Sequence, residues 1–183
     1  MPHRNGRSGV ARSVALGGIL SSFAIVILMG GGYIPIGTFA APIFAGLCLM
    51  PIAIDIGVKW ALLCYLAVCL LSFLLVPDME LVLFFVVLLG WYPIFQPVLG
   101  RLRSRALRFI IKLVMFNAAV AVVYCILLFL FISPELQQEF SEHGWWYSAC
   151  LLAVGNLTFF LYDNMLYKVR LVYHHRIRRY LFR

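Results

Sequence analysis

Long stretches without a single charged residue constrain this chain more than any other feature of its sequence. Between Arg12 and Asp55 no Asp, Glu, Lys or Arg occurs. A membrane-spanning helix needs about 20 apolar residues, so this stretch is too long for one crossing. Residues 30–37, GGGYIPIG, divide it, because glycine and proline favour a turn there. The stretch therefore predicts two membrane-spanning helices.

Composition and the other uncharged stretches extend this prediction to the whole chain. Of the 183 residues, 64% are hydrophobic and only 12% are charged, whereas about a quarter of the residues in soluble domains are charged. The stretches lack the polar/apolar alternation of a membrane β-barrel. We expect an all-α integral membrane protein, formed by residues 1–183 as a single six-helix bundle. The predicted spans are residues 12–32, 38–56, 59–77, 80–100, 109–133 and 145–167.

The basic residues predict the orientation of this bundle. If the N-terminus is cytoplasmic, all 15 Lys and Arg residues lie in the inner segments, which are residues 1–12, 55–59, 101–112 and 168–183. The outer loops contain Asp and Glu but no Lys or Arg. Cytoplasmic loops of membrane proteins carry such an excess of Lys and Arg. We therefore expect both termini in the cytoplasm, with the basic tail 168–183 lying along the interface. The net charge of +8 then indicates contact with anionic membrane lipid and not with nucleic acid.

The sequence contains no set of residues typical of a catalytic or metal site. Its four histidines lie near the termini or in a predicted outer loop, and neither HExxH nor a Gly-rich phosphate loop occurs. The five cysteines show no CxxC spacing. We therefore predict a protein that is not an enzyme and has no catalytic residue, bound metal or cofactor.

Polar and aromatic side chains inside the predicted spans are the candidates for ligand binding. Polar groups are costly in lipid, so they tend to face the interior of a helix bundle. Four of the candidates fall near mid-membrane, and two belong to an aromatic cluster toward the outer side. Because the outer loops lack Lys and Arg, we expect a neutral or cationic, planar ligand in a pocket that opens outward. The candidates are Tyr33, Trp91, Tyr92, Asn117, Tyr124 and Asn156.

Structural interpretations compete with this pocket. Asn117 and Asn156 are equally typical of a hydrogen bond that joins two helices. Tyr33 is also typical of the aromatic belt at a membrane interface. Asp163, which lies near the predicted inner face, is expected to pair with a basic residue such as Lys59 or Lys112 rather than with a ligand.

The first span begins with a face of small residues. Ala11, Ala15, Gly18 and Ser22 follow one another at the spacing i, i+4, i+7 and i+11, which places them on one side of a helix. Small residues let another helix approach closely. We expect this face to pack either inside the same bundle or, because Ala11 lies at the cytoplasmic end, against a partner protein.

The segment ARSVA, residues 11–15, resembles the AxxxA motif of the S components, which are the substrate-binding subunits of energy-coupling factor vitamin transporters. The first loop, GGGYIPIG, and the compact chain with six helices and both ends inside are similar to the same family. The resemblance implies a subunit in a bacterial inner or plasma membrane that binds a small nutrient from outside. It also implies that Ala11, Ala15 and Gly18 contact a coupling transmembrane subunit, which two ATPase subunits drive.

Other functions remain open. The chain is also consistent with a non-transporting membrane assembly or regulatory protein that packs against a larger membrane complex. An integral lipid-modifying enzyme is less well supported, because no catalytic set is visible in the sequence.

Overall fold

The computed structural model describes residues 5–34, 37–100, 104–129 and 134–173, which are mainly helical and contain no strand. The all-α prediction is confirmed. The π-helical turn η1 interrupts the fourth span. The elements are α1 (Asn5–Gly31), α2 (Gly37–Asp55), α3 (Val58–Leu75), α4 (Met79–Phe84), η1 (Phe85–Leu89), α5 (Tyr92–Gly100), α6 (Arg105–Phe129) and α7 (Pro134–Val172).

Six segments of the described chain are helical, long and apolar enough to cross a membrane, as predicted. Their mean hydropathy lies between 1.3 and 2.3, and they indicate a multi-pass membrane protein. The cytoplasmic location of the termini stays a prediction, and residues 174–183 of the basic tail lie outside the described residues. The six segments are Ser13–Gly31, Gly37–Asp55, Val58–Leu75, Met79–Pro97, Ala106–Leu127 and Ala149–Val172.

Two spans differ in form from the predicted ones. The span predicted over residues 80–100 consists of α4, η1 and α5, so it is a broken helix rather than a continuous one. The last helix, α7, begins at Pro134 and has 39 residues. The helix of the sixth span therefore continues backward through most of the segment predicted as the third outer loop, whereas the apolar span itself begins at Ala149.

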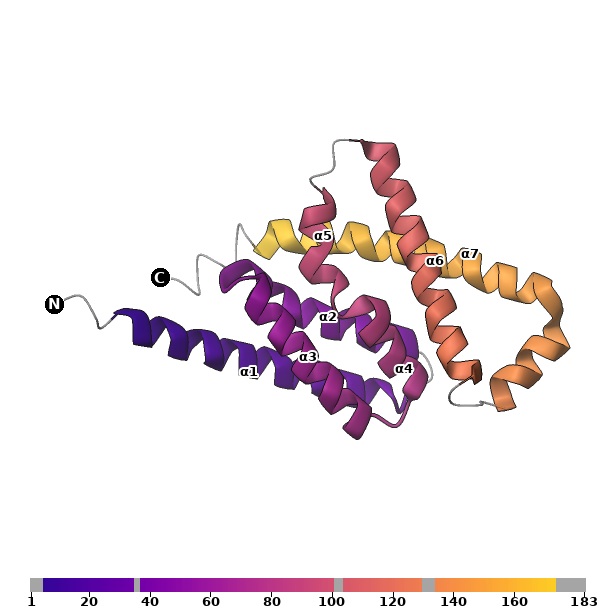
Figure 1. The fold of residues 1–183 in the computed structure, drawn as a ribbon, viewed down its shortest axis with the longest axis horizontal. Helices are drawn as coiled ribbons and strands as arrows, with labels where there is room; N and C mark the ends of the chain where they lie inside the picture. Colours follow the sequence, from indigo (N-terminus) through magenta and orange to yellow (C-terminus); the bar gives the residue numbers. More distant parts are fainter. Residues whose placement is uncertain (1–4, 35–36, 101–103, 130–133, 174–183) are drawn as a thin grey trace. The chain divides into compact units, whose positions relative to one another are not determined.

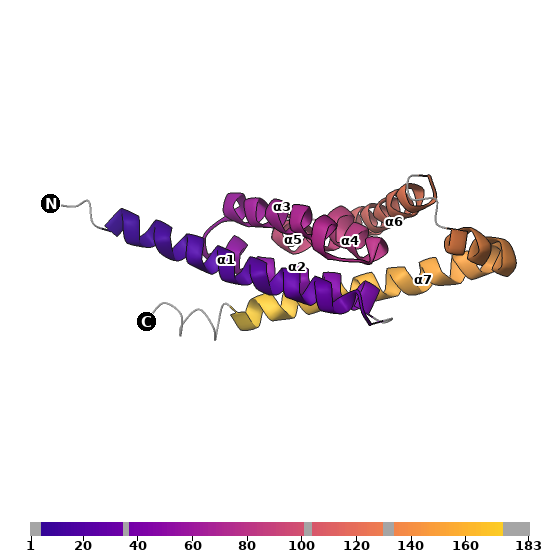
Figure 2. The ribbon, with the colours of Figure 1, turned by 90° about the horizontal axis from the view of Figure 1, so that it is seen from below.

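The chain divides into two compact units, which we describe separately: unit 1 is Met1–Pro97 and unit 2 is Val98–Arg183. In unit 1, α1 packs against α2 and α3, and α2 also contacts α4 and η1. Figures 1 and 2 show α1, α2 and α3 side by side, with the N-terminal end of α1 projecting beyond the other two. In unit 2, α6 packs against α7. The single bundle over the whole chain stays a prediction.

The core of unit 1 combines small and large apolar residues. Ala24, Ala45 and Ala61 are fully buried and let the helices approach closely, which is how helices associate in lipid. Leu70 and Leu74 on the outside of α3 are 74% and 81% exposed. Large apolar side chains on the outer surface suit contact with lipid tails.

Asp78 joins the beginnings of two helices in unit 1. It is the N-cap of α4, and its Oδ1 accepts a hydrogen bond from the backbone N–H of Leu81 at 3.1 Å. Its Oδ2 accepts the hydroxyl of Thr38, in the first turn of α2, at 2.8 Å. At the other end of α2, Gly57 has φ 126°, a backbone conformation that favours glycine and allows the tight turn into α3.

Candidate functional site

The small-residue face of α1 is uncovered in the structure. Ala11, Ala15 and Gly18 are all exposed, and a Cβ atom added at Gly18 would meet no heavy atom within 4 Å. Beside them, Val14 and Ile19 are 54% and 57% exposed. Among the described residues of unit 1, nothing packs on this face.

The opposite face of α1 makes the contacts of unit 1. Gly17 is buried, and a Cβ atom added there would lie 3.1 Å from Sγ of Cys64 on α3. Ala24 and Leu28, further along the same face, are fully buried. Packing in unit 1 thus uses this face, and the three candidate partner-binding residues point away from it.

The fourth span changes its helical register near its middle. The backbone N–H of Gly90 donates to the carbonyl oxygen of Phe85 at 2.7 Å, five residues earlier, as in a π-helix. In an α-helix the same N–H would donate to Val86. Pro93 follows and has no N–H to continue the α-helical pattern. Such π turns inside α-helices are frequent at functional sites.

Side chains bind the carbonyl oxygens that this register releases. The hydroxyl of Tyr65, on α3, donates to the carbonyl oxygen of Val86 at 2.5 Å. The indole N–H of Trp91 donates to the carbonyl oxygen of Val87 at 2.7 Å. The break is therefore a hydrogen-bonded structure within unit 1, and it does not leave these two carbonyls bare in an apolar environment.

Gly90 is required by close contacts at this break. A Cβ atom at residue 90 would lie 2.8 Å from the carbonyl oxygen of Phe85 and 2.8 Å from the ring of Tyr65. Any larger residue would force these neighbours apart. The glycine thus allows the backbone to lie directly against the Tyr65 ring.

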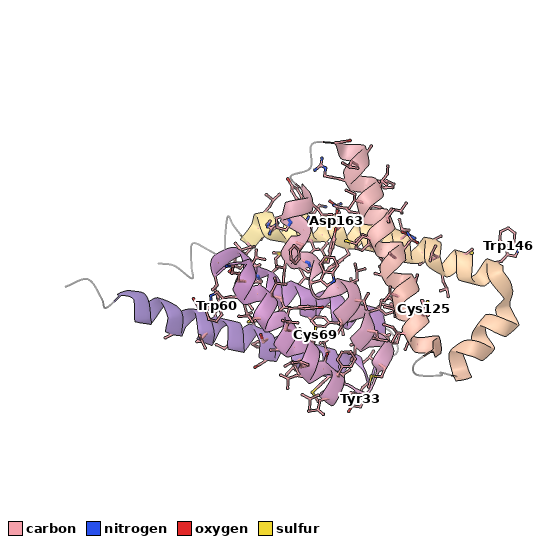
Figure 3. All side chains as sticks on the ribbon, viewed as in Figure 1. Tyr33, Trp60, Cys69, Cys125, Trp146 and Asp163 are labelled. Atoms are coloured by element: carbon pink, nitrogen blue, oxygen red, sulfur yellow. The ribbon has the colours of Figure 1, made fainter. Side chains whose placement is uncertain are left out.

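The candidate ligand-binding residues of unit 1 are in three different environments. Tyr33 follows α1, is 75% exposed, and lies at the opposite end of unit 1 from Trp60 (Figure 3). Trp91 is half-buried and already uses its N–H inside the span. Tyr92 is fully buried. Trp91 therefore has a ring to offer a ligand but no unused donor.

The two asparagines of unit 2 bind each other. Nδ2 of Asn117 donates to Oδ1 of Asn156 at 3.0 Å, and Nδ2 of Asn156 donates to Oδ1 of Asn117 at 3.2 Å. Each Nδ2 also donates, at 2.8 Å, to a carbonyl four residues earlier in its own helix, Leu113 or Leu152. All N–H groups of the two amides are thus used, which favours the helix-joining interpretation.

An ion pair lies at the same interface between α6 and α7. Nζ of Lys112 lies 2.5 Å from Oδ2 of Asp163, and the two side chains are only 13% and 16% exposed. The expectation that Asp163 pairs with a basic residue is confirmed. Stacked rings of Phe109 and Phe160, with centroids 4.7 Å apart, pack at this interface too.

The six predicted pocket residues are divided between the units. Tyr33, Trp91 and Tyr92 belong to unit 1, whereas Asn117, Tyr124 and Asn156 belong to unit 2. Tyr124 is half-buried and lies seven residues after Asn117, on the same side of α6. A pocket built from all six stays a prediction.

Tyr65 was not among the residues predicted from the sequence. Tyr65 lies on another helix, and nothing in the neighbouring sequence points to a bond with Val86. Within the residues the structure describes, no group of three His, Cys, Asp or Glu side chains is placed to hold a metal ion.

The chain matches no protein-family model, and it matches no curated protein and no solved structure.

Proposed function

We propose that this chain is the substrate-binding membrane subunit of an ATP-driven uptake transporter for a small, vitamin-like nutrient. In this proposal a separate coupling subunit and two ATPase subunits supply the energy, as in the S-component family. The protein lies in a bacterial cell membrane with both termini in the cytoplasm. The observation that supports the proposal most is the exposed face of Ala11, Ala15 and Gly18 on α1.

Contact with lipid alone does not call for such a face. The outer surface of α3 carries large side chains, among them Leu70 and Leu74. A face of alanine and glycine offers lipid little side-chain surface, but it lets the backbone of another helix approach closely. The small residues of α1 therefore suit a partner helix better than they suit lipid.

The broken fourth span supports a role in binding a substrate. Irregular backbone within a membrane is tolerated only where protein buries it or where it lines a cavity. In many transporters the substrate site is formed by discontinuous helices. Trp91 and Tyr92 lie directly after the π turn of this span, so two candidate ligand-binding residues occur where its backbone is irregular.

The second candidate function is a membrane assembly or regulatory protein without a transported ligand. The pairing of Asn117 with Asn156 favours it, because their amide donors already have acceptors in the protein. Under this proposal the same α1 face binds a membrane complex that contains no ATPase.

Purification of the tagged protein from its native host distinguishes the two proposals. We expect a membrane subunit, two ATPase subunits and a small neutral or cationic molecule to be recovered with it, identified by mass spectrometry. A stable partner without any ATPase and without a bound small molecule would contradict the transport proposal and support the second one. Recovery from cells depleted of the ligand should retain the protein partners and lose only the small molecule.

A further inference from the structure

Two consecutive carbonyl oxygens of the fourth span have two competing donors each. In the structure Val86 accepts from the Tyr65 hydroxyl, and Val87 accepts from the Trp91 indole. In a continuous α-helix the backbone N–H groups of residues 90 and 91 would donate to these same oxygens. Side-chain donors therefore replace the backbone donors that these two carbonyl oxygens would have in a continuous α-helix.

We propose that the fourth span is a two-state hinge, in which residues 85–91 change between the π register of the structure and an α register. The hydroxyl of Tyr65 holds the π register, and its release from Val86 permits the other one. A change of register by one residue rotates α5 relative to α4 by about 100°. This inference does not depend on which ligand or partner the protein has.

Both registers provide a hydrogen-bond donor for the carbonyl oxygen of Val86. The Val86 carbonyl is bonded in both, by Tyr65 in one and by Gly90 in the other, so neither state buries it without a donor. Pro93 weakens the helix just beyond, because it provides no N–H for a carbonyl four residues earlier. Elements with two such discrete arrangements are the usual basis of switching in proteins.

Two substitutions shift this equilibrium by independent means. Tyr65→Phe keeps the ring and removes only the hydroxyl that bonds Val86. Gly90→Ala places a methyl group 2.8 Å from the Phe85 carbonyl oxygen and from the Tyr65 ring, so it disfavours the π register sterically. Both variants should therefore populate the same alternative state.

Fluorine NMR of the whole protein, labelled with 5-fluorotryptophan, measures this state at Trp91. The chain has four tryptophans, and the Trp91 signal is assigned by its loss in Trp91→Phe. We expect a second Trp91 signal whose population rises roughly fivefold or more in Tyr65→Phe, the factor given by one net hydrogen bond. Gly90→Ala should produce a signal at the same position. Tyr167→Phe, which removes the hydroxyl of a residue that is 57% exposed on α7, should leave the Trp91 signal unchanged.

A single, unmoved Trp91 signal in both folded variants would overturn the hinge, as would two variants with unrelated new signals. Unmoved signals from the other three tryptophans show that a variant has kept its fold. If a variant does not fold, saturation transfer on the wild-type protein decides the question. Exchange of the Trp91 signal with a minor one supports the hinge, and its absence at all temperatures below unfolding contradicts it.

Discussion

The side-chain amides of Asn117 and Asn156 form a reciprocal hydrogen-bonded pair between α6 and α7, with N–O distances of 3.0 and 3.2 Å. The pair of Lys112 with Asp163 lies at the same interface, and the two pairs together show that the helices run antiparallel. Because lipid offers no hydrogen bonds, polar groups inside a membrane associate with one another. These two pairs define the register in which α6 meets α7.

The amide pair predicts a specific pattern of stabilities. Asn117→Leu should lower the free energy of unfolding by about 1–3 kcal/mol, because it leaves the Asn156 amide without its partner. The double variant Asn117→Leu/Asn156→Leu should lose less than the sum of the two single losses. Denaturant titration in detergent micelles measures both. Asn164→Leu is the matched control, since Asn164 is an exposed amide on the same helix, and it should change little.

A different result would favour ligand binding by these amides. In that case Asn117→Leu would unfold like the wild-type protein in the absence of ligand, and it would abolish the stabilisation that the ligand gives.

The ion pair predicts that exchanging its two charged residues restores stability that a single substitution removes. Lys112→Met removes the counter-ion of a carboxylate that is only 16% exposed, so we expect a loss of about 3 kcal/mol in the free energy of unfolding. The exchange Lys112→Asp/Asp163→Lys should restore more than half of this loss. If the exchanged protein is no more stable than Lys112→Met, the pair does not stabilise the interface.

The N-cap of α4 predicts a smaller and more local effect. Asp78→Ala removes acceptors for Leu81 N–H and for the Thr38 hydroxyl, and it should destabilise the protein by about 1 kcal/mol. Asp78→Asn keeps an oxygen acceptor at the cap and should retain most of the stability. Equal losses in the thermal unfolding of the two variants would show that the negative charge matters and the cap does not.

The distribution of charge predicts the topology. Reporter fusions after Arg105 and after Gln138 should lie on opposite sides of the membrane, the first in the cytoplasm, because every Lys and Arg belongs to a predicted inner segment. Each site is fused to two reporters: a phosphatase that is active only outside the cytoplasm, and a fluorescent protein that is fluorescent only inside it. The same side for both fusions would contradict the orientation.

The sequence predicts the spans well because a charged side chain in lipid has an unfavourable free energy, so the spans contain few charges. The absence of charge between Arg12 and Asp55 defined two helices, and the structure places them at Ser13–Gly31 and Gly37–Asp55. Asp163 could be paired with a basic residue for the same reason, since an isolated charge in a span needs a counter-ion.

The register of the fourth span could not be predicted in this way. It depends on Tyr65, which lies more than twenty residues before Val86 and whose hydroxyl reaches the carbonyl only once α3 has packed. Sequence patterns report which residues prefer lipid or a helix, but not which backbone oxygen a distant side chain will bind. For the same reason Asn117 and Asn156 were open to two interpretations until their distance was known.

The central claim is that the small-residue face of α1 binds a partner. It is tested most directly by substituting a large side chain on that face. Ala11→Trp and Ala15→Trp should each reduce the partner recovered by co-purification roughly tenfold or more, because overpacking a close contact costs about 1–3 kcal/mol. Both variants should keep the wild-type thermal stability, since these residues are exposed. Ala67→Trp makes the same change at an exposed position on α3, and it should retain the partner. Equal recovery of the partner with all three variants would contradict the claim.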